Sequence, residues 1–196
     1  MEIIFATKNQ GKLKEVKEIL KDYTVLGMEE IGVNIDVVED GETFEENALK
    51  KATQIMQVTG KIVLSDDSGM EIDYLNKEPG VDSANYMGRD TPYARRNAAI
   101  LDMLKNAKGH ERNARYVAVI AAAFPDGKTL IAKGIMEGYI GHEQRGEGGF
   151  GYDPIFYPSG YEQSVAELSA EAKNAISHRG IALREMMRLL DDVLNP

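Results

Sequence analysis

Three cationic or hydrogen-bond-donating side chains lie within seven residues near the end of the chain, at Lys173, His178 and Arg179. The last two belong to "ISHRG", just ahead of "IALREMMRLLDDVL", which has the periodicity of an amphipathic helix. Ser177 is a good N-cap, so His178 and Arg179 are expected in the first turn. Cations are disfavoured there, because that end of the helix dipole is positive. The two side chains therefore either face a bound anion or an electron-rich base, or simply point into water.

Acidic side chains form a second group. "VVEDGETFEENA" contains Glu39, and Asp66 and Asp67 follow the apolar run "KIVL" directly. Hard cations such as Mg²⁺ take oxygen ligands, often one or two carboxylates together with phosphates and waters. We expect the two aspartates at a strand end, where open α/β sheets place their sites. If the strand continues through them, one carboxylate can reach a metal while the other supports the structure. An ordinary acidic turn and a solvated loop are the alternatives.

Two further segments have the composition of ligand-binding loops. "ATKNQGK" predicts a strand, a tight loop and a helix N-terminus, which present backbone N–H groups to an anion, and Lys12 adds a point charge. The alternative is that Thr7 and Asn9 only cap the helix. "GEGGFGYDP" places glycines around Phe150, which suits close approach to a planar ring and stacking on it, and Asp153 could bond a base edge. A flexible connection is the alternative for this second loop.

Strands and helices alternate along the chain around these groups. Short strands are expected at 2–6 and 61–65, and a long hairpin at 114–124 and 129–140 about the turn "PDGK". Helices are expected over "LKEVKEIL", after a capping box that Thr43 opens, after Thr91 with Pro92 in the first helical position, and over the final amphipathic run. This order predicts an α/β fold with a mixed sheet.

Length and charge limit the possible classes of protein. The 196 residues contain no internal repeat or linker, so we expect a single domain over 1–196. The 23 basic and 32 acidic residues give a net charge of −9, which argues against nucleic acid as a partner. Cysteine is absent, so no disulfide, thiolate metal site or cysteine nucleophile is possible. No apolar run is long enough to span a bilayer, and we expect a cytoplasmic protein without membrane partners.

Five motifs, taken together and in order, resemble the inosine triphosphate pyrophosphatase family. They are "TKNQGK", "EDGETFEENALKKA", "DDSG" with "PGVDSA", "GGFGYDPIF" and "KNAISHRG", and the resemblance covers residues 3 to about 190. Enzymes of this family hydrolyse non-standard purine nucleoside triphosphates to the monophosphate and pyrophosphate. The resemblance implies an α/β fold with a long mixed central β-sheet flanked by helices, and two lobes with an intervening substrate cleft. It also implies dependence on Mg²⁺ and a homodimer.

The resemblance also assigns roles to individual residues. Glu39 and Asp67 would hold the metal, and Asp67 would be the catalytic carboxylate that activates water. The residues near the phosphates would be Thr7, Lys8, Asn9, Gln10, Gly11, Lys12, Lys51 and Ser68, and the nucleoside pocket would contain Phe150, Gly151, Tyr152, Asp153, Lys173, His178 and Arg179. Because Lys173, His178 and Arg179 are rich in donors, we expect preference for bases with an acceptor oxygen at position 6, as in ITP, dITP and XTP.

The match departs from the family pattern in one region. After "PGV" the family usually reads Y-S-A-R-Y, whereas this chain has "DSANY", with Asp82 and Asn85, and "NK" replaces the usual "GG" before "PGV". The departures leave open any contact of that loop with substrate or a partner subunit, and "NK" suggests a reshaped loop. A pyrophosphatase of other base preference and a non-catalytic nucleotide-binding protein are the alternative functions. Glu39 and Asp67 argue against the second, since a binder needs no catalytic carboxylate.

Overall fold

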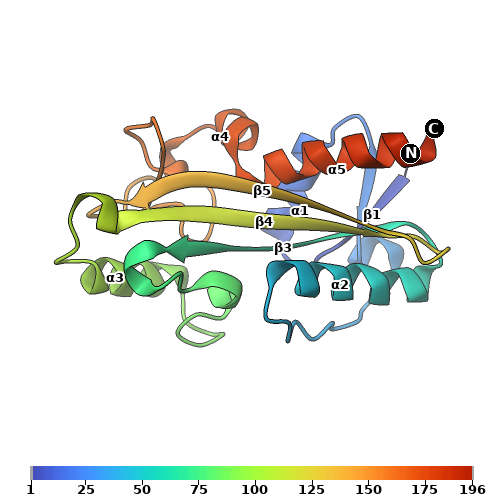
Figure 1. The fold of residues 1–196 in the computed structure, drawn as a ribbon, viewed down its shortest axis with the longest axis horizontal. Helices are drawn as coiled ribbons and strands as arrows, with labels where there is room; N and C mark the ends of the chain where they lie inside the picture. Colours follow the sequence, from blue (N-terminus) through green and yellow to red (C-terminus); the bar gives the residue numbers. More distant parts are fainter. Residues whose placement is uncertain (1, 196) are drawn as a thin grey trace. The chain divides into compact units, whose positions relative to one another are not determined.

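Six strands form one mixed sheet in the computed structural model, which describes residues 2–195 (Figure 1). The strand order is β2–β1–β3–β4–β5–β6. Strand β1 pairs in parallel with β2 and β3, whereas β5 and β6 are antiparallel, so the predicted mixed α/β sheet is confirmed. The strands are β1 Glu2–Ala6, β2 Thr24–Gly27, β3 Val63–Ile72, β4 Asn113–Ala123, β5 Thr129–Ile140 and β6 Phe156–Pro158.

The helices of the described chain begin close to where the sequence predicts, except a short one at 170–176 that was not predicted. They are α1 Gln10–Ile19, α2 Phe44–Thr59, α3 Tyr93–Met103, α4 Ala170–Ile176 and α5 His178–Leu194. Thr43 opens α2 with the predicted capping box, in which its hydroxyl accepts from the N–H of Glu46. The predicted cap at Thr91 is wrong, because Pro92 is the N-cap of α3 and the Thr91 hydroxyl donates to the Met87 carbonyl at 2.8 Å. Among the described residues, none of the helices combines the length and apolar character needed to cross a membrane.

The chain separates into two compact units, in line with the two expected lobes. The first contains the residues up to Asp67, Ala118–Gly134 and those from His178 on, and the second contains Ser68–Val117 and Ile135–Ser177. Strands β3, β4 and β5 each contribute residues to both units.

In the first unit, α1 and α5 cover one face of the sheet and α2 covers the other (Figure 1). Apolar residues of α1 and α5 pack with β1 and β4 in one core, which includes Val16, Ile120 and Leu183. The start of α5 lies directly against β5 at Gly134. A Cβ atom at that glycine would stand 2.0 Å from the His178 carbonyl oxygen, so only glycine allows this close approach. The side chains that begin α5 are thereby fixed to the sheet.

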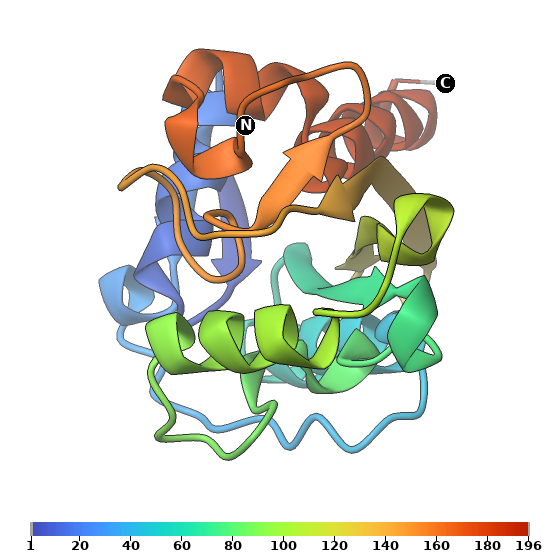
Figure 2. The same cartoon turned by 90° about the vertical axis from the view of Figure 1, so that its left-hand side faces the viewer.

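The second unit has its own core around the far parts of β3, β4 and β5. Met70, Tyr116 and Phe156 are buried in it, together with Ile100 of α3. Helix α3 lies in the foreground of Figure 2, and the orange segment is the one that leads through β6. This unit contains the glycine-rich stretch before β6, whose glycines at 146, 149 and 151 all have positive φ.

Strand β3 is longer than the sequence predicts. We expected the strand to end at Ser65, but it continues through Asp66 and Asp67 to Ile72. The reason is that Met70 and Ile72, beyond the aspartates, are fully buried apolar residues of the second core. The two aspartates therefore lie within the strand, and their side chains point to opposite faces of the sheet.

Candidate active site

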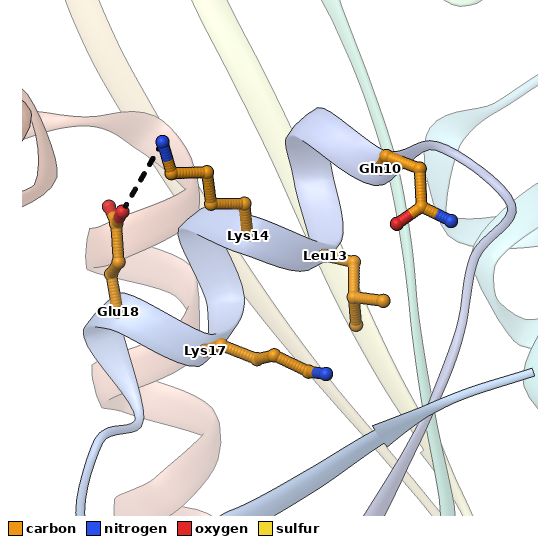
Figure 3. A pocket seen from close by; sticks show the side chains of 5 residues that line it. All are labelled: Gln10, Leu13, Lys14, Lys17 and Glu18. Carbon is orange, nitrogen blue, oxygen red and sulfur yellow. Dashed lines mark ion pairs between the residues drawn. The ribbon is translucent and has the colours of Figure 1, made fainter. Parts of the chain in front are cut away.

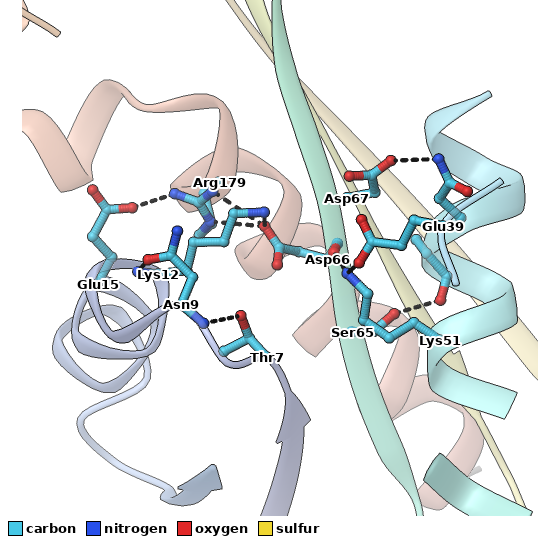
Figure 4. Close-up of polar contacts among 12 residues, drawn as sticks. Thr7, Asn9, Lys12, Glu15, Glu39, Lys51, Ser65, Asp66, Asp67 and Arg179 are labelled. Carbon is cyan, nitrogen blue, oxygen red and sulfur yellow. Dashed lines mark hydrogen bonds and ion pairs between the residues drawn. The ribbon is translucent and has the colours of Figure 1, made fainter. Parts of the chain in front are cut away.

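Asp66 lies at the centre of a buried group of cations in the first unit (Figure 4). Its Oδ2 atom accepts from Lys12 Nζ at 3.0 Å and from Arg179 Nη2 at 3.1 Å, and its side chain is fully buried. Burial alone would raise the pKa of Asp66, but Lys12, Arg179 and Lys51 outweigh it and hold the pKa well below its ordinary value. Asp66 is therefore ionised, and it fixes two cations beside the start of α1.

Asp67 has a different environment. Asn47 Nδ2 of α2 donates to its Oδ2 atom at 3.1 Å, and the residue is 5% exposed. Burial raises the pKa of Asp67 to about 6, and the nearby carboxylates of Glu39 and Asp66 add to the rise that Lys12 and Lys51 oppose. A carboxylate whose pKa lies close to neutral pH is suited to accept a proton during a reaction.

Lys51 lies between these two carboxylates and Glu39. Its Nζ atom donates to the backbone carbonyl of Asp66 at 3.0 Å and forms a close ion pair with Glu39. Burial would lower the pKa of Lys51, but Asp66 and Glu39 raise it above the ordinary value, so the side chain stays charged. Asn47 and Lys51 are one turn apart on α2, so one face of that helix supplies both groups.

The carboxylates of Glu39 and Asp67 fit a hard divalent cation by their chemistry. Mg²⁺ commonly takes one or two carboxylates and completes its coordination with phosphate oxygens and waters. The effect of Glu39 on the pKa of Asp67 means that the two negative charges lie near each other, and a cation would relieve their repulsion. No cluster of three or more histidine, cysteine or acidic side chains with metal-binding geometry occurs within residues 2–195. A metal here would depend on ligands from the substrate.

The loop before α1 combines a helix cap with exposed polar side chains. The Asn9 side chain accepts from the N–H of Lys12 at 3.1 Å, and the Thr7 hydroxyl accepts from the N–H of Asn9. Asn9 therefore caps α1, as its position before the helix predicts. Lys8 is exposed and pairs with Asp36 at 2.6 Å, and Gln10 is also exposed. Gly11 is half-buried between Gln10 and Lys12.

The cations at the start of α5 have a partner within the protein. Arg179 is 2% exposed and bonds both Asp66 and Glu15, so two carboxylates compensate the unfavourable dipole at this end of the helix. His178 is also buried. The alternative in which these side chains point into water is thus wrong.

The predicted nucleoside residues of the second unit form a connected group around Asp153. Its Oδ2 atom accepts from Lys173 Nζ at 2.7 Å and from the N–H of Phe150 at 2.9 Å. Lys173 Nζ lies 4.7 Å from the centre of the Phe150 ring, within cation–π range. Tyr152 is buried, and its hydroxyl donates to the Ser83 carbonyl at 2.7 Å. Asp153 therefore organises Phe150 and Lys173.

The structure divides the predicted residues between its two units. Thr7 to Lys12, Glu39, Lys51, Asp67, His178 and Arg179 belong to the first, whereas Ser68, Phe150 to Asp153 and Lys173 belong to the second. Within the first unit, Asp66 joins Lys12 and Arg179, which lie 167 positions apart in the chain by their numbers. Ser68 is half-buried and follows Asp67 on β3.

A hollow of about 330 Å³ lies beside α1 (Figure 3). Gln10, Leu13, Lys14, Lys17 and Glu18 line it. Its lysines face carboxylates, because Lys14 lies 4.0 Å from Glu18 and Lys17 lies 2.8 Å from Glu30. None of the residues that line the hollow contacts Asp66 or Asp67 in the bonds described above.

A protein-family model matches residues 3–189, and its description is the Ham1 family. The chain belongs to the Ham1 family. A dITP/XTP pyrophosphatase from Desulforamulus reducens is 46% identical over 193 residues, which cover 97% of this chain and 96% of that protein. One of the same name from Bacillus subtilis is 43% identical over 192 residues, which cover 97% of both chains. The solved structure of the Staphylococcus aureus Ham1 protein is similar with a TM-score of 0.87 and 41% identity, covering 98% of this chain and 99% of its own.

These likenesses confirm the family and the α/β fold that the motifs predict. In the region that departs from the family pattern, Asp82 and Asn85 are exposed. Asn76 and Lys77, which replace the usual glycines, have φ values of 52° and 72°. Such angles favour glycine, so the backbone of this loop has the type of conformation that the glycines would supply more easily.

Several residues around the site escaped the sequence analysis of this Ham1 chain. Glu15 lies among the apolar positions of α1, and nothing in its spacing indicates that it pairs with Arg179. Asn47 did carry a signal, because it stands four positions before Lys51 on a predicted helix. The sequence places Asp66 beside Asp67, but the role of Asp66 as the partner of Lys12 and Arg179 depends on the tertiary fold.

Proposed function

We propose that the chain hydrolyses non-standard purine nucleoside triphosphates, namely ITP, dITP and XTP, to the nucleoside monophosphate and pyrophosphate. The names of its relatives support this function, since both pyrophosphatases cited above are described as acting on dITP and XTP. The observation that supports it most directly is the setting of Asp67. This buried carboxylate, with a pKa of about 6, lies on the same strand as Asp66 and its cations.

The reaction breaks the anhydride bond between the α- and β-phosphates. A water attacks the α-phosphorus, pyrophosphate leaves, and the proton of the water must be accepted. Asp67 would orient this water and take the proton, because it is ionised above about pH 6 and lies in the same unit as the loop before α1. No covalent intermediate is needed, since phosphoryl transfer depends mainly on positioning and charge neutralisation.

Glu39 and Asp67 would hold Mg²⁺. When bound, Mg²⁺ supplies neutralisation of phosphate charge, which favours departure of pyrophosphate. Lys12 and Lys51 would neutralise further phosphate charge. The N–H groups of Lys8, Gln10 and Gly11 at the start of α1 would bind phosphate oxygens, while Asn9 caps the helix. Thr7, Gln10 and Ser68 would contribute polar contacts to the same phosphates.

Base choice would depend on hydrogen-bond donors. Phe150 would stack on the purine, with Gly151, Tyr152 and Asp153 shaping the loop around it. Lys173 and His178 would face the oxygen at position 6, which adenine lacks, whereas Arg179 is 2% exposed and bonds Asp66 and Glu15. A site built on such bonds can discriminate by a factor of about 10⁴, because the wrong base leaves buried polar groups unpaired.

A nucleotide panel tests this function. ITP, dITP, XTP, GTP and ATP are each incubated with the protein and Mg²⁺, and pyrophosphate and orthophosphate are measured separately. We expect pyrophosphate from ITP, dITP and XTP at a kcat/KM far above that for ATP, and no activity in excess chelator. Similar kcat/KM values for ITP and ATP would favour the alternative of another base preference. Binding without product would favour a non-catalytic binder.

A homodimer and a cytoplasmic location complete the proposal. The family resemblance supports the dimer, and the absence of cysteine is consistent with a reducing compartment. Light scattering of the purified protein would distinguish a dimer from a monomer of 21.7 kDa.

A further inference from the structure

Helix α3 contacts the loop that carries Phe150, although none of its residues belongs to the motifs discussed above. Asn97 of α3 is 1% exposed, and its Nδ2 atom donates to the Gly151 carbonyl at 3.2 Å. The same nitrogen approaches Gln144 Oε1 at 3.5 Å, and Gln144 Nε2 donates to the Ala94 carbonyl at 3.3 Å. The helix thus holds the segment before β6 at two positions, 144 and 151.

Burying the Asn97 amide carries a cost that its packing does not explain. Its Oδ1 atom is buried without a hydrogen-bond partner within the described part of the chain. An unsatisfied buried acceptor is destabilising, and an apolar side chain of similar shape avoids this cost. The amide donates a hydrogen bond to the carbonyl of Gly151, whose φ is 69°. Glycine has more backbone freedom than any other residue, so this position has the most to gain from a restraint. The contact therefore restrains a residue next to Phe150.

Tyr116 reaches the same loop from strand β4. Its hydroxyl donates to Asp153 Oδ1 at 3.2 Å, while its ring packs on Phe156 with the ring centres 4.6 Å apart. Burial, and then the charge of Asp153, raise the pKa of Tyr116 well above its ordinary value, so the hydroxyl keeps its proton and remains a donor. The other oxygen of Asp153 bonds both Lys173 and the N–H of Phe150. Tyr116 therefore holds the carboxylate that in turn binds Lys173 and the backbone of Phe150.

We propose that Asn97 and Tyr116 are positioning residues of the base-binding loop 149–153, which they hold in its binding conformation before the nucleotide arrives. This inference rests on the proposed function, because it takes Phe150 and Lys173 as the groups that contact the base. A loop ordered in advance loses less conformational freedom when the ligand binds, and so binds it more tightly. Neither residue needs to touch the nucleotide.

Two conservative variants test the proposal. Asn97→Leu keeps the branched shape and removes both polar atoms, and Tyr116→Phe removes only the hydroxyl. Tyr86→Phe is the matched control, because the Tyr86 hydroxyl also donates to a carboxylate, that of Glu78, at the same 3.2 Å but outside the loop. For each variant, calorimetry gives the Kd of IMP and of inorganic tripolyphosphate, steady-state kinetics give kcat and KM for ITP and ATP, and thermal unfolding reports the folded fraction.

We expect the Kd of IMP and the KM of ITP to rise about 3- to 10-fold in Asn97→Leu and in Tyr116→Phe, and the preference for ITP over ATP to fall. The Kd of tripolyphosphate and kcat should stay within about twofold, because all the proposed phosphate-binding residues except Ser68 lie in the first unit, whereas the loop 149–153 belongs to the second. Tyr86→Phe should match the wild type. A general structural defect would instead weaken IMP and tripolyphosphate binding together.

Three results would overturn the positioning role. The first is wild-type IMP binding in Tyr116→Phe, which is decisive even if Asn97→Leu fails to fold. The second is equal loss of IMP and tripolyphosphate binding in both variants. The third is a wild-type protein that neither binds IMP nor cleaves ITP, which would also remove the proposed function, and only this result is visible before any variant is made.

Discussion

The two faces of strand β3 at Asp66 and Asp67 differ in charge although the residues are neighbours. On one face, Asp66 bonds Lys12 and Arg179, and its pKa lies well below the ordinary value. On the other face, Asp67 bonds the neutral Asn47, and burial raises its pKa to about 6. The same side chain thus serves as a fixed anion in one place and as a proton acceptor in the other, because alternation along a strand gives neighbours different surroundings.

The largest effect should come from removing the carboxylate of Asp67. Asp67→Asn keeps the size of the side chain and can still accept from Asn47, but it cannot take a proton from water. We expect kcat for ITP to fall about 10²–10⁴-fold while the protein still binds nucleotide. Steady-state kinetics with pyrophosphate detection measure this loss. Near-normal turnover would show that Asp67 has no part in the chemistry.

Asp66→Asn should instead reduce stability. This substitution leaves the half-buried Lys12 and the buried Arg179 without the negative charge that both contact. Breaking a buried ion pair by removing one partner costs about 3–5 kcal/mol. Urea unfolding, with the midpoint and slope fitted separately, measures the change. A free energy of unfolding equal to that of the wild type would mean that the cations do not depend on Asp66.

The Asp67→Asn variant should be more stable than the wild type, and the difference should depend on pH. Because the pKa of Asp67 is raised from 3.8 to about 6 on folding, the protonated form favours folding below about pH 4, and this contribution is lost as the pH rises through about 6. Above that pH the variant should gain about 1–3 kcal/mol. Melting temperatures of both proteins between pH 4 and 8, without metal, test this. A difference that does not change with pH would contradict the raised pKa.

For Asp66 the pH dependence has the opposite sign. Its pKa is lowered on folding, so its contribution to stability is present above about pH 4 and declines as the pH falls below that value. The stability difference between the wild type and Asp66→Asn should therefore shrink in acid, in the pH range where the Asp67→Asn difference also vanishes.

A smaller effect is expected at Asn47. Its Nδ2 atom donates to Asp67, and its Oδ1 atom accepts from the N–H of Gly41 at 2.8 Å. Asn47→Leu removes both bonds, and we expect kcat to fall about tenfold, because Asp67 loses the group that orients it. The kcat of Asn47→Leu is compared with that of Asp67→Asn and of the double variant. Full additivity of the two losses would show that Asn47 does not act through Asp67.

Much of this fold follows from local patterns in the sequence. The apolar run 2–6, the capping box at Thr43 and the turn between β4 and β5 each fix an element through nearby residues alone. The predicted end of β3 at Ser65 is wrong, because two adjacent charged residues are more typical of a loop than of a buried strand. Asp66 can be buried only because residues distant in the sequence, such as Arg179, pair with it. The predicted cap at Thr91 is wrong for a local reason, because its hydroxyl donates to the Met87 carbonyl four positions earlier.

The site could be predicted as a set of motifs but not as a set of contacts. Glycine and lysine in "TKNQGK" and the aspartates of "DDSG" are recognisable residue types at recognisable spacing. The pairing of Arg179 with Glu15, and of Tyr116 with Asp153, joins residues that the chain brings together only on folding. Such contacts between distant residues set the burial and the neighbouring charges that fix the pKa values of Asp66 and Asp67. The different roles of the two aspartates could therefore not be predicted from the sequence.

The most direct test of this difference is a carboxyl ¹³C NMR titration of the metal-free protein, with Asp67→Asn and Asp66→Asn used to assign the two resonances. We predict that the Asp67 carboxyl titrates with a pKa of about 6, whereas the Asp66 carboxyl stays ionised well below the ordinary range for aspartate. Titration of both carboxyls near the ordinary value of 3.8 would contradict the assignment of Asp67 as proton acceptor and Asp66 as fixed anion.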